Sequence, residues 1–293
     1  MMNSKRIAVL GLGLMGSSLA LALRKRNADL TIFGFARREE ARQKAEASGM
    51  VDAVYADPVD AVRDADLIVI CVPIWSIAAL AKTIVSALKP GAVVTDVGST
   101  KSDLIQKMAA LFTGTNACFV GSHPIAGSEK TGIDEGNPDL YAGRLTVVCP
   151  TETTPIEAGE AVVELWKSVG SEVMNMSPDE HDAMLASTSH LPHMVAAALT
   201  RSVAKGHPEA KADFCGTGFR DTTRVASGSA DMWVDIIDTN RAALRAELDR
   251  FHEELQGLID ILSNGNSDDI RRWLEEAAEN RNRIINLNRF LKR

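Results

Sequence analysis

His123 is the residue whose surroundings in the sequence most clearly indicate chemistry. It follows a short apolar run, residues 118–120, that predicts a buried strand, and Pro124 restricts the backbone beside it. Glycines in the segment 121–132 leave room for a ligand to approach the main chain. Because ligands of nucleotide-binding sheets collect at the carboxyl ends of the strands, we predict that His123 transfers a proton beside a cofactor.

Ser99 occupies a similar place after the preceding predicted strand. It belongs to the segment 98–101 (GSTK), which follows the strand predicted at residues 93–97 and precedes a helix. A serine at this point can cap the helix, or its hydroxyl can lie beside His123 and contact the substrate. The sequence supports the two roles about equally.

Two pairs of basic side chains lie further along the chain. His190 and His193 are three residues apart in SHLPH, so a helix would place both on one face. Substrate contact and a structural role in the core both fit this pair. No third ligand or HExxH-like pattern accompanies it, so no metal site is predicted.

Arg220 and Arg224 form a second pair of basic residues, four positions apart. They suit a substrate carboxylate, although surface salt bridges would also explain them.

The chain begins with a dinucleotide-binding motif. Residues 11–16 (GLGLMG) follow the strand predicted at residues 6–10 and lead into a helix, and this context distinguishes the motif from an ordinary glycine-rich turn. Its glycines would allow the tight turn, the approach of the pyrophosphate and the close packing of the helix. The predicted cofactor-binding residues of the motif are Gly11, Gly13, Leu14, Met15 and Gly16.

The residues after the second predicted strand indicate which dinucleotide is bound. A site selective for NAD usually carries Asp or Glu about 20 residues after the motif, where it holds the ribose 2′-hydroxyl. Ala36 stands there instead, and Arg37 and Arg38 follow it with guanidinium groups that suit a 2′-phosphate. We therefore predict NADP as the preferred cofactor, with NAD as the alternative, and expect Val72 and Pro73 to be further cofactor contacts.

The two parts of the chain carry different patterns. Up to residue 176, β-branched runs alternate with amphipathic segments, which predicts an α/β Rossmann domain with a parallel sheet. Residues 177–293 show helical periodicity, which predicts an all-α domain. An apolar stripe from Ile237 to Leu262 could pair with a second subunit or pack within a bundle, and the pattern favours neither. The predicted strands are residues 6–10, 30–34, 67–72, 92–97, 118–121, 144–149 and 172–176.

Composition disfavours several classes of partner. The 293 residues include 32 Lys and Arg against 39 Asp and Glu, and this net charge of −7 argues against a nucleic-acid-binding surface. The four cysteines form no CxxC pair, as expected in a reducing compartment. The uncharged run at residues 67–81 is too short to span a membrane, and no signal peptide is predicted. We expect a cytoplasmic protein without nucleic-acid or membrane partners.

Taken together, these segments resemble the prephenate/arogenate dehydrogenase family of tyrosine biosynthesis. The resemblance rests on GLGLMG, DVGSTK, GSHPIAGSEKTG, HD followed by SHLPH, and GFRDTTR, and it covers nearly the whole chain. It implies a Rossmann domain followed by a helical dimerisation domain, and hence a homodimer. It also implies a monofunctional enzyme that oxidatively decarboxylates a cyclohexadienyl acid, either prephenate or arogenate. Ala36 departs from the acidic residue of members that use NAD, which suits the branch that uses NADP.

The resemblance further implies roles for individual residues. His123 would act as the base at the substrate hydroxyl, and Ser99 would bond the same hydroxyl or orient His123. Arg224 would hold a substrate carboxylate, with Arg220 nearby. Glu129 would pair with Arg224 and close the site.

Further substrate contacts are implied in the helical part. His193 would touch the substrate and His190 would support it. The remaining residues implied near the pocket are Ser128, Trp233 and Asn240.

Two alternative functions are considered for the chain. One is another Rossmann oxidoreductase, of the β-hydroxyacid or imine-reductase type, and the other is an NADP-binding regulator without turnover. The lysine-bearing, glycine-rich helix of the β-hydroxyacid enzymes is not found in the sequence.

Overall fold

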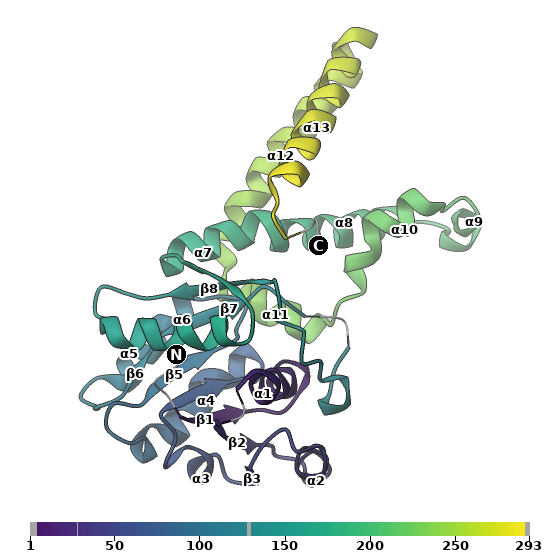
Figure 1. Cartoon of the computed structure of the whole chain (residues 1–293). Helices are drawn as coiled ribbons and strands as arrows, with labels where there is room; N and C mark the ends of the chain where they lie inside the picture. The colour runs from purple at the N-terminus through teal and green to yellow at the C-terminus, as the bar shows by residue number, and fades with distance from the viewer. Residues whose placement is uncertain (1–4, 28, 128–129, 291–293) are drawn as a thin grey trace.

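A parallel six-stranded sheet forms the centre of the N-terminal part of the chain (Figure 1). The computed structural model describes residues 5–27, 29–127 and 130–290. The sheet has the order β3-β2-β1-β4-β5-β6, which reverses between β1 and β4, where doubly wound folds bind nucleotides. This order confirms the predicted Rossmann architecture. The strands are β1 (Arg6–Leu10), β2 (Thr31–Phe35), β3 (Ala53–Tyr55), β4 (Leu67–Ile70), β5 (Val93–Asp96) and β6 (Cys118–Phe119).

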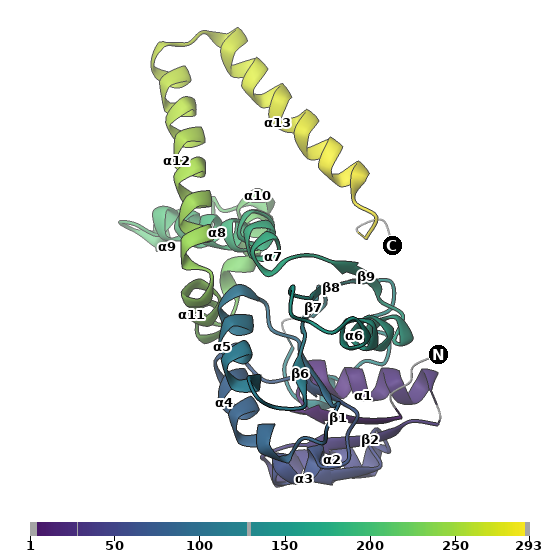
Figure 2. The same ribbon diagram turned by 90° about the vertical axis from the view of Figure 1, so that its left-hand side faces the viewer.

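Helices cover both faces of this sheet (Figure 2). They are α1 (Leu14–Arg26), α2 (Glu39–Ser48), α3 (Pro58–Val62), α4 (Ile74–Ile84), α5 (Ser102–Phe112) and α6 (Ile156–Ser168). Successive side chains of each strand enter opposite cores. Ile7 and Val9 pack in the core of α1 and α6, whereas Ala8 and Leu10 pack in the core of α3, α4 and α5. A strand covered on both faces must be apolar throughout, as the sequence of β4 (LIVI) is.

The strand predicted at residues 118–121 divides into two. β6 ends at Phe119, and β7 (Gly121–Pro124) joins a second sheet with β8 (Leu145–Cys149) and β9 (Glu172–Asn175). β7 and β8 are antiparallel, so the structure differs here from the single parallel sheet expected from the sequence. His123 therefore lies within a strand, opposite Val147, rather than after the end of one.

The helical part begins with two helices joined by a π-helical turn. α7 (Pro178–Leu185) starts at a capping box formed by Ser177 and Glu180. It continues through the π-helical turn Ala186–His190 into α8 (Leu191–Val203). Pro192 lies in the first turn of α8 and lacks the amide hydrogen that would bond the preceding turn. Such a widened turn re-aims the side chains that it carries and is frequent at functional sites.

The rest of the chain forms an arm, a return helix and a long hairpin (Figure 1). The arm carries α9 (Pro208–Ala212) and α10 (Thr217–Thr223), and α11 (Ala230–Thr239) leads back toward the sheet. α12 (Arg241–Asn264) and α13 (Ser267–Leu287) extend away from the remainder. The expected stripe from Ile237 to Leu262 therefore spans two helices, because α11 ends at Thr239 and α12 begins at Arg241. No helix in the described part of the chain has both the length and the apolar character of a membrane span.

Candidate active site

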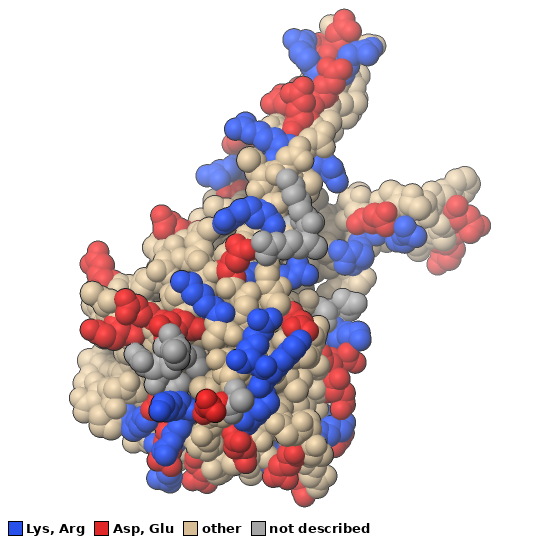
Figure 3. Space-filling view, viewed as in Figure 1, with Lys and Arg blue, Asp and Glu red and all other residues tan. Residues whose placement is uncertain are grey.

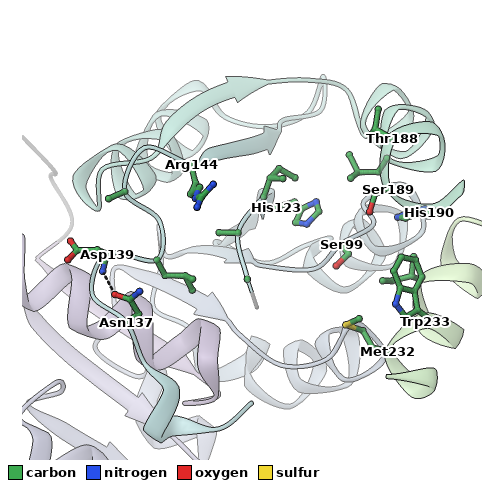
Figure 4. Close-up of a pocket in the computed structure, with 17 residues that line it drawn as sticks. Ser99, His123, Asn137, Asp139, Arg144, Thr188, Ser189, His190, Met232 and Trp233 are labelled. Atoms are coloured by element: carbon green, nitrogen blue, oxygen red, sulfur yellow. Dashed lines mark hydrogen bonds between the residues drawn. The ribbon is translucent and has the colours of Figure 1, made fainter. Parts of the chain in front are cut away.

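A pocket of about 780 Å³ lies between the second sheet and the helical part (Figure 4). It brings together Ser99 and His123, which follow different predicted strands, with His190 and Trp233 from the helical part. Its apolar wall includes Leu185, Met232, Trp233 and Ile236. Its polar and charged residues are Ser99, His123, Asn137, Asp139, Arg144, Thr188, Ser189 and His190.

Ser99 faces this pocket and does not cap the following helix. The residue at the N-cap of α5 is Lys101. The loop between β5 and α5 is held by the Asp96 carboxylate, which accepts hydrogen bonds from the backbone N–H groups of Gly98 at 2.7 Å and Ser122 at 3.0 Å. The buried Lys101 ammonium donates to Asp96 and to the carbonyl of Ser122. This network fixes the position of Ser99 relative to β7.

His123 is held by a second histidine that the sequence analysis did not assign. Its Nδ1 lies 2.9 Å from Nε2 of His181, and Nδ1 of His181 lies 2.8 Å from Oδ1 of Asp182. Burial lowers the pKa of His123 well below 6.5, and the neighbouring His181, Lys101 and His190 lower it further. The imidazole of His123 is therefore neutral near pH 7, which is the state that can accept a proton.

His190 and His193 have different surroundings, although they are three residues apart. His190 lines the pocket, whereas His193 stacks on Trp233 with ring centroids 3.6 Å apart and does not line it. His190 therefore lies nearer the pocket than expected, and it belongs to the π-helical turn Ala186–His190. The substrate contact of His193, with His190 as its support, stays a prediction. Asn240 Nδ2 lies 3.2 Å from His190 Nδ1, and burial lowers the pKa of His190 to about 4. No cluster of His, Cys, Asp or Glu within the described residues could hold a metal ion.

Arg144 is a pocket residue that carries no sequence signal beyond its position before a strand. Figure 4 shows it on the side of His123 opposite His190. It is the only Arg or Lys among the described residues that line the pocket. Asp139, on the same side, pairs with Lys25 at 2.7 Å. Arg144 can therefore bind an anionic group of a ligand.

The expected arginine pair lies elsewhere. Arg220 belongs to α10 in the arm and pairs with Asp221 at 2.9 Å, and Arg224 follows in a short 3₁₀ turn. Neither side chain lines the pocket of its own chain. Ser128 and Glu129, also expected at the site, lie outside the described residues.

The glycine-rich loop fits a dinucleotide. Gly11 has a φ of 104°, and a Cβ there would lie 2.5 Å from the carbonyl oxygen of Cys71. A Cβ on Gly16 would lie 1.9 Å from the carbonyl oxygen of Gly11. Gly13 caps α1 and has no atom within 4 Å of the corresponding position, so the space in front of the helix N-terminus is open. An open glycine at a helix N-terminus is what a pyrophosphate requires.

The other expected cofactor residues surround this loop. Leu14 and Met15 begin α1, and Met15 also accepts a hydrogen bond from the buried Tyr141 hydroxyl at 2.6 Å. Val72 and Pro73 connect β4 to α4, and Val72 approaches Gly11. All four therefore lie at the point where the strand order reverses.

The loop after β2 presents basic side chains beside Gly13. Arg37 and Arg38 are exposed, and Arg38 lines a cavity of about 430 Å³ together with Gly13. Arg42, which the sequence analysis did not assign, donates to the carbonyls of Ala36 at 2.9 Å and Arg37 at 2.8 Å. Arg42 therefore holds the loop that carries the predicted 2′-phosphate site.

Lys44 adds a further cation to the same cavity. Its ammonium pairs with Glu40 at 2.8 Å and with Asp134 at 2.7 Å. These hydrogen bonds raise the pKa of Lys44 and lower that of Glu40, so both remain charged. The pair with Asp134 connects α2 to the segment that follows β7.

Comparison with known proteins identifies the family. Residues 19–175 match the model of the prephenate dehydrogenase nucleotide-binding domain, and residues 177–276 match that of the prephenate dehydrogenase dimerization domain. Cyclohexadienyl dehydrogenase of Zymomonas mobilis is 34% identical over 280 residues, which cover 94% of this chain and 95% of that protein. Prephenate dehydrogenase of Lactococcus lactis is 32% identical, over 94% of this chain and 76% of that protein.

Solved structures agree with this assignment. Prephenate dehydrogenase from A. aeolicus, in complex with hydroxyphenyl propionate and NAD+, has a TM-score of 0.89 and 30% identity, covering 96% of this chain and 98% of that one. Synechocystis arogenate dehydrogenase has a TM-score of 0.85 and 31% identity, covering 95% and 99%. A 3-hydroxyisobutyrate dehydrogenase from Salmonella typhimurium, at 17% identity and a TM-score of 0.60, shares only the fold. The chain belongs to the prephenate dehydrogenase family, and the predicted class of enzyme, a dehydrogenase that uses a nicotinamide cofactor, is confirmed.

Proposed function

We propose that this chain oxidatively decarboxylates prephenate, arogenate or both, with NADP as the preferred oxidant. The observation that carries the proposal is the neutral, half-buried His123, which shares one pocket with Ser99. Asn137 lies at one end of this pocket, and its backbone N–H donates to Ser18 of α1 at 2.9 Å. The pocket thus reaches the helix whose N-terminus fits the pyrophosphate. A bound dinucleotide supplies the acceptor for the hydride.

His123 acts as the base in this proposal. The substrate hydroxyl gives its proton to Nε2 of His123 while the hydride leaves the carbon that bears the hydroxyl. The ring carboxylate then departs as CO2, its bonding electrons make the ring aromatic, and the ring oxygen takes a proton back. Ser99, which lines the same pocket, holds the same hydroxyl by a hydrogen bond. General-base assistance of this kind contributes roughly 10²–10⁴ in rate.

Arg144 is the candidate partner for a substrate carboxylate within one chain, since no other Arg or Lys in the described part of the chain lines the pocket. Trp233 and Met232 supply an apolar surface for the ring. Arg224 does not line the pocket of its own chain, and we propose that it serves the pocket of a second copy. Among the described residues that line the pocket, Asp139 is the only carboxylate, and it is paired with Lys25. Both prephenate and arogenate therefore remain within the proposal.

NADP preference is supported by the charges around the second strand. Ala36 offers no carboxylate to a ribose 2′-hydroxyl, whereas Arg38 and Lys44 line the cavity beside Gly13. Guanidinium groups bind phosphate through paired, charge-assisted hydrogen bonds. Arg37 is exposed on the same loop and can add a further contact.

A homodimer is part of the proposal, with residues 1–176 as the nucleotide-binding domain and residues 177–293 as the substrate and dimerisation domain. Large apolar side chains of the hairpin are exposed, among them Leu262 at 63%, Leu274 at 55% and Ile284 at 66%. Figure 3 shows acidic and basic side chains on the same hairpin. Apolar surface bordered by charges is typical of an interface with another chain.

Initial rates of nicotinamide reduction test this function. Prephenate and arogenate are each combined with NAD and NADP, and we expect the highest kcat/KM with NADP. Turnover with NAD but not with NADP would contradict the proposed NADP preference, but it would still support the proposed reaction. No turnover in any of the four combinations would overturn the reaction itself.

A further inference from the structure

We infer that His181 and Asp182 fix His123 in the one tautomer that can accept the substrate proton. This inference rests on the proposed function, since it assigns two positioning residues to the base of that reaction. The three side chains form a line, with Asp182 bonded to His181 and His181 bonded to His123. The two imidazole rings meet edge to face, with centroids 5.1 Å apart and an angle of 69°.

Asp182 is the fixed end of this line. Its carboxylate accepts hydrogen bonds from the backbone N–H groups of Lys101 at 2.8 Å and Ser102 at 2.9 Å. Burial alone would raise the pKa of Asp182, but the hydrogen bonds from His181 and these two N–H groups outweigh burial and lower it. Asp182 is therefore ionised and can only accept, so Nδ1 of His181 must carry a hydrogen.

The tautomer of His181 in turn determines the tautomer of His123. A neutral imidazole with a hydrogen on Nδ1 has a lone pair on Nε2. Nε2 of His181 lies 2.9 Å from Nδ1 of His123, so the neutral form of His181 makes Nδ1 of His123 the donor. Nε2 of His123 is then free of hydrogen and can accept the proton of the substrate hydroxyl. His181 is completely buried, so its own ring nitrogens are shielded from solvent.

His190 has the opposite tautomer by the same reasoning. The side-chain amide of Asn240 donates to Nδ1 of His190, so a neutral His190 carries its hydrogen on Nε2. The pocket thus contains one imidazole that accepts and one that donates. A hydroxyl between them can give its proton to His123 and accept a hydrogen bond from His190 or Ser99.

The line also stabilises His123 after proton uptake. Only the proton of the substrate hydroxyl moves, from oxygen to Nε2 of His123. The Nδ1 hydrogen of His123 remains bonded to His181, whose own hydrogen remains bonded to the Asp182 carboxylate. The negative charge of Asp182 is thereby coupled to the positive charge that forms on His123, and the tautomer is restored when the proton leaves.

NMR of the side-chain nitrogens tests the tautomer directly and requires no turnover. The protein contains six histidines, and His123→Asn assigns the signals of His123. We expect the wild-type protein at neutral pH to carry the hydrogen of His123 on Nδ1 and that of His181 on Nδ1. A hydrogen on Nε2 of His123 would overturn the inference, whatever the enzyme does with prephenate or arogenate.

Two substitutions of His181 test its contribution to the rate. The side-chain oxygen of His181→Gln can still accept from His123, whereas His181→Phe can accept nothing. We expect His181→Phe to mix the His123 tautomers and to lower kcat on the order of 10²–10⁴-fold, with KM and NADP affinity little changed. In the His181→Gln variant, His123 should keep its Nδ1 hydrogen, and kcat should fall about tenfold or less.

Controls separate this inference from folding defects and from the proposed function. His252→Gln, an exposed change on α12, should leave kcat unaltered. If His181→Phe does not fold, the wild-type NMR spectrum still decides the tautomer. An unchanged tautomer and full kcat in folded His181→Phe would refute the positioning role. A wild-type protein that turns over neither cyclohexadienyl acid would refute the proposed function while leaving the tautomer measurement valid.

Discussion

Asp96 and Lys101 form an ion pair that is completely buried beneath the loop carrying Ser99. Both side chains are 0% exposed, and the ammonium also donates to the carbonyl of Ser122 on β7. The pair therefore joins the first sheet to the second beneath the pocket that Ser99 and His123 both line.

Lys101→Met should strongly destabilise the protein. It leaves the Asp96 carboxylate buried without a counter-ion, and breaking a buried pair in this way typically costs about 3–5 kcal/mol. Urea unfolding measures the change. The matched control is Lys107→Met, which removes an exposed pair with Asp103 and should cost about 0.5 kcal/mol or less. Equal costs for the two substitutions would contradict this account, and Asp96→Asn combined with Lys101→Met should recover part of the loss.

The pH dependence of kcat/KM should reflect the lowered pKa of His123. Burial is the main cause of that low pKa, and His181, Lys101 and His190 are the charged or titratable groups that add to it. A base works while it is neutral, so activity should persist as the pH falls through 6.5 and decline only at the lower pKa of the folded protein. Steady-state rates between about pH 5 and 8 test this. A decline centred at 6.5 would show that His123 is not the titrating base.

Arg38→Ala should weaken NADP binding selectively. A charge-assisted hydrogen bond contributes about 1.5–3 kcal/mol, so KM for NADP should rise roughly 10–150-fold while KM for NAD hardly changes. Ala36→Asp should move the preference further toward NAD, because the new carboxylate repels a 2′-phosphate and can hold a 2′-hydroxyl. The ratio of kcat/KM for the two cofactors is the measurement. An unaltered ratio in both variants would mean that other residues recognise the ribose 2′ position of the cofactor. Lys44→Ala would then be the next variant to measure.

The stability of the protein should fall as the pH drops from 6.5 toward 4. The pKa of His190 is 6.5 when unfolded and about 4 in the folded protein, chiefly because it is buried. Above pH 6.5 neither state is protonated, but between the two values only the unfolded state takes up the proton. His190 alone should therefore lower the free energy of unfolding by up to about 3 kcal/mol as the pH falls across this window. Asp182, whose pKa lies below 3.8, does not titrate in it.

Urea unfolding at the two ends of this window measures the effect. His190→Gln should reduce the dependence on pH, because glutamine does not titrate there. The exposed His252→Gln should leave the dependence as it is. A stability that is flat over the window would mean that His190 is protonated in the folded state.

The proximity of Ser99 and His123 could be predicted from the sequence because it follows from topology. Each follows a predicted strand, and the ends of neighbouring strands meet at one edge of a sheet. The structure keeps both residues at one pocket, although His123 lies within β7 of the second sheet. The roles of Gly11 and Gly16 could be predicted for the same kind of reason, since a turn of positive φ and a tight strand–helix contact are local requirements. The division of residues 118–121 into two strands was missed, because an apolar run does not specify which sheet it joins.

The partners of the pocket residues could not be predicted. His123 and His181 are 58 positions apart, and their contact depends on how α7 docks against β7. Arg144 lies in no motif, so nothing local distinguishes it from a surface arginine. The spacing of Arg220 and Arg224 indicates that they share a helix face, but it says nothing about where the arm that carries them lies.

Mixed dimers test the proposed role of Arg224 in the pocket of a second copy. His123→Asn removes the base of one pocket, and Arg224→Ala removes the guanidinium that would serve the other. If Arg224 acts across the dimer, a dimer of one His123→Asn chain and one Arg224→Ala chain retains a pocket with both groups. Random mixing makes half of the dimers mixed, and half of their pockets intact, so about a quarter of wild-type activity should return. Two separately inactive variants that stay inactive after mixing would exclude the role across the dimer. An Arg224→Ala protein with unchanged KM would leave Arg144 as the carboxylate partner.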